Sequence, residues 1–170
     1  MSFSLIKSVK KRFFCTTPPA TRLQFLSMNI TMLLADAVQV ADGKLYILGG
    51  GWSVTGPQPT PAGIAIKIEV TANEFDRNHH WELFLEDADG ALVLLDTPEG
   101  PQSLEVRGDF VATAPADAMP GTPVIVPMGI NFGPLPLTPG QRFTWRLVVN
   151  GESLEGSTAS FSTRPMPAEL

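Results

Sequence analysis

Short runs of alternating apolar residues, separated by glycine and proline, limit the folds that are open to this chain. The clearest run is 62–70, where Ile64, Ile66, Ile68 and Val70 alternate with small or charged residues. A period of two is that of a β-strand with one side in a core and the other in water. The sixteen prolines and fifteen glycines stand between such runs, which is typical of all-β proteins. We predict an antiparallel β-sandwich of about eight or nine strands, immunoglobulin-like or related.

The charges divide the chain into unequal parts. Of its 12 basic and 17 acidic residues, five basic and no acidic ones lie in residues 1–27. Residues 28–170 therefore hold 7 basic and 17 acidic residues, a net charge of −10. We predict a basic extension over 1–27, a sandwich domain over 28–165 and a tail over 166–170. The extension is interpreted as a disordered arm or as translation from too early a start codon; a partner-binding arm and a targeting segment are the alternatives.

The acidic main body argues against two classes of partner. Nucleic acids and anionic membrane surfaces are bound by basic faces, so we expect neither nucleic acid nor a membrane as a partner. No apolar run reaches the roughly 18 residues that span a bilayer. The single cysteine, Cys15, cannot form an internal disulfide. A soluble cytoplasmic protein is the simplest expectation, and a virion or another assembly is the alternative location.

Residues 33–56 hold the strongest local pattern. Two apolar runs flank the turn sequence Ala-Asp-Gly at 41–43, which predicts a β-hairpin. The second run ends in Gly49-Gly50-Gly51, followed by Trp52. Three consecutive glycines have no side chains to pack, so they indicate a bulge, a sharp bend or the close approach of another group. We take this triplet and Trp52 as the candidate binding residues.

The ionisable residues form no complete catalytic or metal-binding pattern. Asp36 lies between small apolar residues, where we expect a structural hydrogen bond to a neighbouring loop. His79 and His80 are adjacent on a predicted strand, so they point to opposite faces and cannot hold one metal ion together; we expect both to face solvent. Asp87 and Asp89 resemble the start of a calcium loop without its later ligands, so we interpret them as a hairpin turn, with a metal site as the weak alternative. We predict no cofactor.

Motifs of the common enzyme classes are missing from the sequence. It contains no G-x-S-x-G, no P-loop and no G-x-G-x-x-G, which are the signatures of a nucleophile elbow and of nucleotide binding. Trp81 and Trp145 lie in predicted strands that alternate with polar residues, and we expect both in the core. We therefore predict no catalytic residue.

Several fragments together resemble a known family. They are LLADAVQVADGKLYILGGGW, NHHWELFLEDADG, PLPLTPGQRFTWRLVVNGE and FSTRP. In this order they are similar to an uncharacterised bacterial protein family, a domain of unknown function, over about residues 28–165. The resemblance implies a β-sandwich and brings no activity, ligand or catalytic residue with it.

Three functional hypotheses follow from these observations. The first is a non-enzymatic binding or protein-interaction module that works through a sheet edge or through the Gly49–Trp52 end. The second is a structural subunit of a larger assembly, virion-like or secretion-type, that uses the basic extension. The third is an enzyme with a loop-borne site. A protein partner or self-association is expected, and a small-molecule ligand is left open.

Overall fold

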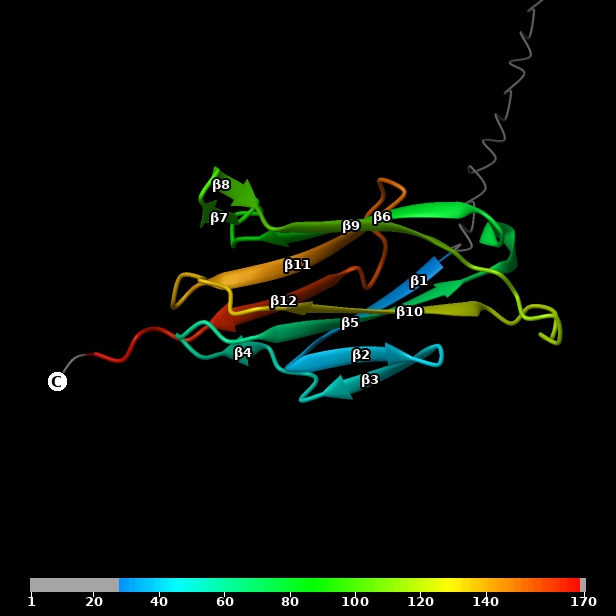
Figure 1. Cartoon of the computed structure of the whole chain (residues 1–170), viewed down its shortest axis with the longest axis horizontal. Coiled ribbons are helices and arrows are strands. Elements are labelled where there is room, and N and C mark those ends of the chain that lie inside the picture. The colour runs from blue at the N-terminus through cyan, green and yellow to red at the C-terminus, as the bar shows by residue number, and fades with distance from the viewer. Residues whose placement is uncertain (1–27, 169–170) are drawn as a thin grey trace, which may run out of the picture.

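Two β-sheets pack face to face in the computed structural model, which describes residues 28–168 (Figure 1). The three-stranded sheet has the order β1-β5-β10, with bounds Met28–Ala35, Ala62–Val70 and Val124–Phe132. The five-stranded sheet has the order β4-β12-β11-β6-β9, with bounds Val54–Thr55, Thr158–Thr163, Arg142–Val149, Asn78–Glu86 and Glu105–Val111. Neighbours are antiparallel except the short pair β4 and β12, which is parallel. The all-β, antiparallel prediction is confirmed.

Two further hairpins and one helical turn complete the described chain. One hairpin joins β2 (Ala37–Ala41) to β3 (Lys44–Leu48), and the other joins β7 (Leu94–Thr97) to β8 (Gly100–Ser103). A 3-10 turn, η1, covers Ala72–Glu74. None of the helices among residues 28–168 is both long and apolar enough to cross a membrane. The predicted basic extension over 1–27, with Cys15, lies outside the described residues.

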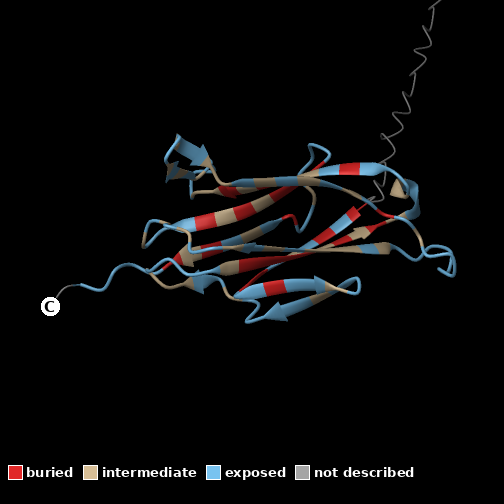
Figure 2. Ribbon diagram, in the orientation of Figure 1, coloured by how far each residue is buried: buried red, intermediate tan, exposed pale blue. Residues whose placement is uncertain are grey.

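The core lies between the two sheets. Ile64, Ile66 and Ile68 of β5 are fully buried, and they face Leu83 and Leu147 of the other sheet, which are also fully buried. Burial of such side chains contributes about 1.5–3 kcal/mol each before the entropy of ordering is subtracted. The red bands on facing strands in Figure 2 mark this layer. The alternation in residues 62–70 therefore predicted the core side of β5 correctly.

Two tryptophans and one proline lie where the packing and the hydrogen bonding of a β-sheet favour them. Trp145 is buried and stacks on Phe132, with ring centroids 4.6 Å apart. Trp81 is partly buried and packs on Gly108, where a Cβ atom would lie 3.1 Å from the indole ring. Pro127 occupies β10 at the edge of its sheet, as expected for a residue that cannot donate to a ladder.

The β2–β3 hairpin covers the outer side of the three-stranded sheet, so the prediction of a wholly solvent-facing side for residues 62–70 is wrong. Ala65 points outward from β5 and is only 3% exposed, because Val38 of the hairpin packs over it. The Asn131 side chain donates to Val38 O at 2.8 Å and accepts from Val38 N at 2.9 Å. Figure 1 shows the hairpin on the far side of this sheet from the five-stranded sheet.

Candidate functional site

The glycine triplet forms the bend that takes the chain out of β3. Gly49 and Gly51 have φ of +61° and +93°, in the left-handed region that favours glycine. A Cβ atom on Gly49 would lie 2.0 Å from Asp36 Oδ2, and one on Gly50 would lie 2.7 Å from Ile47 Cγ2. The predicted interpretation of the triplet as a bend and a close approach is confirmed, and the approaching group is Asp36.

Two backbone hydrogen bonds fix this bend against the junction of β1 and β2. Asp36 N donates to Leu48 O at 3.0 Å, and Gly51 N donates to Leu34 O at 2.8 Å. The bend therefore has a defined position relative to the core strand β1. The bend therefore also fixes the position of Trp52, the next residue.

Trp52 is half-buried, with one part of its ring against the core. Its ring meets that of Phe161 edge-on, with centroids 5.8 Å apart and planes at 87°. The loop 53–61 follows Trp52 and includes β4. The Thr55 and Thr60 hydroxyls hydrogen-bond to each other at 3.2 Å and tie this loop together.

An open groove lies beside the exposed part of Trp52. Its volume is about 600 Å³, within the usual range of ligand pockets. We call it the Trp52 groove, and it is lined by Asp36, Trp52, Val54, Thr55, Gly56, Thr60 and Pro61. A separate crevice of about 30 Å³ shares Trp52, Thr55, Gly56 and Thr60 with it and also borders Leu135, Leu137 and Trp145.

Asp36 supplies the one charged group of the Trp52 groove among the residues that the structure describes. Its side chain is exposed. The expected structural hydrogen bond from its carboxylate is not observed within residues 28–168, where only the Asp36 backbone N–H is bonded. The carboxylate therefore remains available to a ligand.

A second exposed feature is the outer side of the β2–β3 hairpin. Tyr46 is 52% exposed and Leu48 is 70% exposed. Within the described chain, β3 pairs with β2 alone, so one backbone edge of β3 has no strand partner. An apolar strand edge in water is a surface on which other strands pair.

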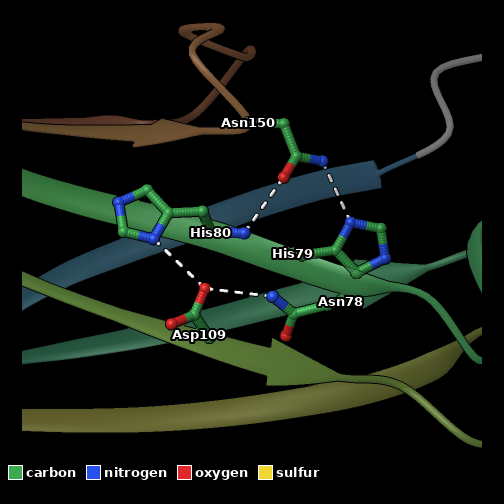
Figure 3. A network of polar contacts seen from close by, with 5 residues as sticks. All are labelled: Asn78, His79, His80, Asp109 and Asn150. Carbon is green, nitrogen blue, oxygen red and sulfur yellow. Dashed lines mark hydrogen bonds and ion pairs between the residues drawn. The ribbon is translucent and has the colours of Figure 1, made fainter.

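The two histidines have different surroundings, and the prediction that both face solvent is wrong for His79 (Figure 3). His79 is only 1% exposed. Its Nε2 donates to the carbonyl of Glu74 at 2.9 Å and its Nδ1 accepts from Asn150 Nδ2 at 3.0 Å. The His80 side chain is 46% exposed, and its Nδ1 lies 3.2 Å from Asp109 Oδ1.

Sequence reasoning missed this network because Asn150 is far from the histidines along the chain. The side-chain oxygen of Asn150 also accepts a hydrogen bond from the backbone N–H of His80 at 3.0 Å. The backbone N–H of Asn150 donates to the His80 carbonyl at 2.8 Å. One asparagine thus holds the start of β6. The network satisfies its buried ring nitrogens internally, which identifies it as a structural element.

The acidic turn at 87–90 is a hairpin turn, as interpreted. Asp87 Oδ1 accepts from the backbone N–H groups of Asp89 and Ala91, both at 2.9 Å. In the described part of the chain, no three His, Cys, Asp or Glu side chains are grouped to hold a metal ion.

The fold and its groove define a β-sandwich domain with a surface site built by one bend and one proline-rich loop. The chain belongs to a family of unknown function (DUF6941), whose model matches residues 30–159. This confirms the resemblance to a domain of unknown function. No curated protein sequence is significantly similar to the chain.

One solved structure is similar to this chain at a low level. It is the Pseudomonas fluorescens alkylpurine DNA glycosylase AlkC bound to DNA containing an abasic site analog, with a TM-score of 0.43 and 15% sequence identity. The match covers 81% of this chain and 30% of that chain. A similarity of this size carries no functional argument.

Proposed function

We propose that the chain is a non-enzymatic binding domain that takes a segment of a partner protein into the Trp52 groove. The observation that carries the proposal is the position of Trp52. Its ring is held at one side by Phe161 and lines an open groove of about 600 Å³ at the other. Aromatic side chains fixed in this way are frequent anchors of protein interfaces, because they offer a large apolar area at low entropic cost.

The chemistry of the groove supports binding rather than catalysis. Acid–base and nucleophilic catalysis usually combine two or more reactive groups around one site. Asp36 is the one titratable residue in the groove lining, and the groove hydroxyls of Thr55 and Thr60 bond to each other. Elsewhere, both ring nitrogens of the buried His79 are already engaged.

Selection from a library of random peptides tests this proposal. Peptides selected on the full chain are expected to lose binding to Trp52→Ala. Leu92→Ala is the matched control, because Leu92 is an exposed apolar residue beside the turn at 87–90. Selected peptides that bind Trp52→Ala as well as they bind the unaltered chain would contradict the proposal.

The exposed edge of β3 favours self-assembly as the second candidate function. The side chains of Tyr46 and Leu48 are exposed to solvent, and they lie beside a strand edge that has no partner within residues 28–168. Pairing of two such edges would bury both side chains and satisfy the free backbone groups. Light scattering during size exclusion tests it: a dimer or larger species that dissociates in Leu48→Lys supports assembly, and a monomer at all concentrations excludes it.

A further inference from the structure

We infer that the Trp52 groove recognises a positively charged side chain, and an arginine in particular, through the Trp52 ring and the Asp36 carboxylate. This inference rests on the proposed function and names the chemistry of the partner segment. Its basis is the combination of an unused acid, an exposed aromatic surface and the lack of any basic residue in the groove lining.

The backbone that carries the Asp36 carboxylate is held in place by its surroundings. Its residue lies between buried Ala35 and strand β2, and its backbone N–H is bonded to Leu48 O. The carboxylate sits directly over Gly49, in the space where a side chain would otherwise lie. It is nevertheless exposed and forms no ion pair or hydrogen bond with the described residues. A charge that is positioned in this way and left unpaired is available to an incoming cation.

The charges of the groove and of the domain favour a cation over an anion. The groove lining has no Lys, Arg or His to bind an anion. The net charge of −10 on residues 28–170 attracts cations at long range. A cation can use both the carboxylate and the indole.

Arginine uses this pair of groups better than lysine does. A guanidinium stacks flat on an aromatic ring and donates two parallel hydrogen bonds to a carboxylate, whereas an ammonium is a compact and strongly hydrated charge. Trp is the best aromatic partner for a cation. The apolar side chains of Val54 and Pro61 in the lining suit the methylene stem of either residue.

The probes for the test are three blocked tripeptides, acetyl-Gly-X-Gly-amide, where X is arginine, lysine or citrulline. Citrulline has nearly the shape of arginine without its charge. Each is titrated into the full chain at matched ionic strength, and the indole N–H signal of Trp52, assigned with Trp52→Phe, is followed by NMR. The indole signals of Trp81 and Trp145 report that the fold is intact.

The arginine peptide is expected to shift the Trp52 signal saturably and to bind about tenfold more tightly than the citrulline peptide, with lysine between them. Asp36→Asn should reduce this difference, because it removes the ion pair and leaves only the contact of the cation with the Trp52 ring. Asp42→Asn is the matched control, since Asp42 is an exposed acid of the hairpin turn outside the groove lining, and it should keep the difference.

Two results would overturn the inference. Equal binding of the arginine and citrulline peptides, with the shift confined to Trp52, refutes the charge preference while the groove remains a binding site. If none of the three peptides shifts the Trp52 signal, the inference is also refuted. If, in addition, library-selected peptides bind Trp52→Ala as well as they bind the unaltered chain, the proposed function fails too.

Discussion

The carboxylate of Asp36 occupies the space that a side chain on Gly49 would fill. A Cβ atom on Gly49 would lie 2.0 Å from Asp36 Oδ2 and 2.5 Å from Asp36 Cγ. Gly49 also has φ of +61°, so glycine is required there both for its backbone conformation and for its small size. The triplet itself does not line the Trp52 groove, but the lack of a side chain at Gly49 leaves room for the Asp36 carboxylate, which does.

Replacing Gly49 with alanine tests this relationship. Gly43→Ala is the matched control, because Gly43 has φ of +68° but nothing lies within 4 Å of its added Cβ. We expect Gly43→Ala to lower the free energy of unfolding by about 1–2 kcal/mol from backbone strain. Gly49→Ala should cost about 1 kcal/mol more from the clash. Unfolding in urea measures both, and adding Asp36→Ala to Gly49→Ala should remove the excess. Equal losses in the two single variants would contradict the steric account.

The two adjacent histidines should respond differently to truncation. His79→Ala removes a buried ring together with its hydrogen bonds to Glu74 O and Asn150 Nδ2, so we expect a loss of about 2–4 kcal/mol in the free energy of unfolding. His80→Ala should change it by less than about 0.5 kcal/mol, because its ion pair with Asp109 is exposed. A loss in His79→Ala as small as the one expected for His80→Ala would show that the hydrogen bonds of His79 in Figure 3 do not stabilise the fold.

Asn131 should anchor the β2–β3 hairpin to the sheet beneath it. Asn131→Ala removes both hydrogen bonds to Val38, and we expect a loss of about 1–2 kcal/mol in the free energy of unfolding. Hydrogen exchange locates the effect: the amides of β2 and β3 should exchange faster, while those of β6 and β11 stay protected. Unchanged exchange in the hairpin would mean that the packing of Val38 alone holds it.

Glu69 offers a prediction on pH. The hydrogen bond from Lys67, then the one from Asn29, and the charge of Lys67 lower the pKa of the Glu69 carboxyl below its ordinary value of 4.5. Because the folded-state pKa is depressed, the contribution to stability is complete above the unfolded-state value. It is lost as the pH falls through the folded-state value. Carboxyl-carbon NMR of Glu69 should show Lys67→Met raising this pKa toward 4.5, and an unchanged pKa would exclude Lys67 as its main cause.

Local patterns predicted β5, the β2–β3 hairpin and the glycine bend, because each depends on residues close together in the chain. The burial of Ala65 was not predictable in this way. Its partner Val38 belongs to another element, and only the fold-back of the hairpin brings the two together. The buried position of His79 depends likewise on Asn150, which lies 71 residues further along the chain.

The sequence Asn150-Gly151 is a strong two-residue hairpin signal, and it lies between β11 and β12. Both residues have positive φ, +52° and +80°, as a tight turn requires. The turn closes only an isolated bridge between Val149 and Glu152, and β12 begins at Thr158. The intervening loop packs on β1, where a Cβ atom on Gly156 would lie 2.0 Å from Ile30 O. β11 and β12 pair as an antiparallel hairpin beyond this loop, and the contact with β1 accounts for the residues between the tight turn and β12.

The most direct test of the Trp52 groove as the binding site is the set of intermolecular NOEs between a library-selected peptide and the full chain. Our account predicts NOEs from the peptide to the ring protons of Trp52 and to Val54 and Pro61 beside it. NOEs to Tyr46 and Leu48 of β3, with none to Trp52, would contradict it and place the interaction on the hairpin edge.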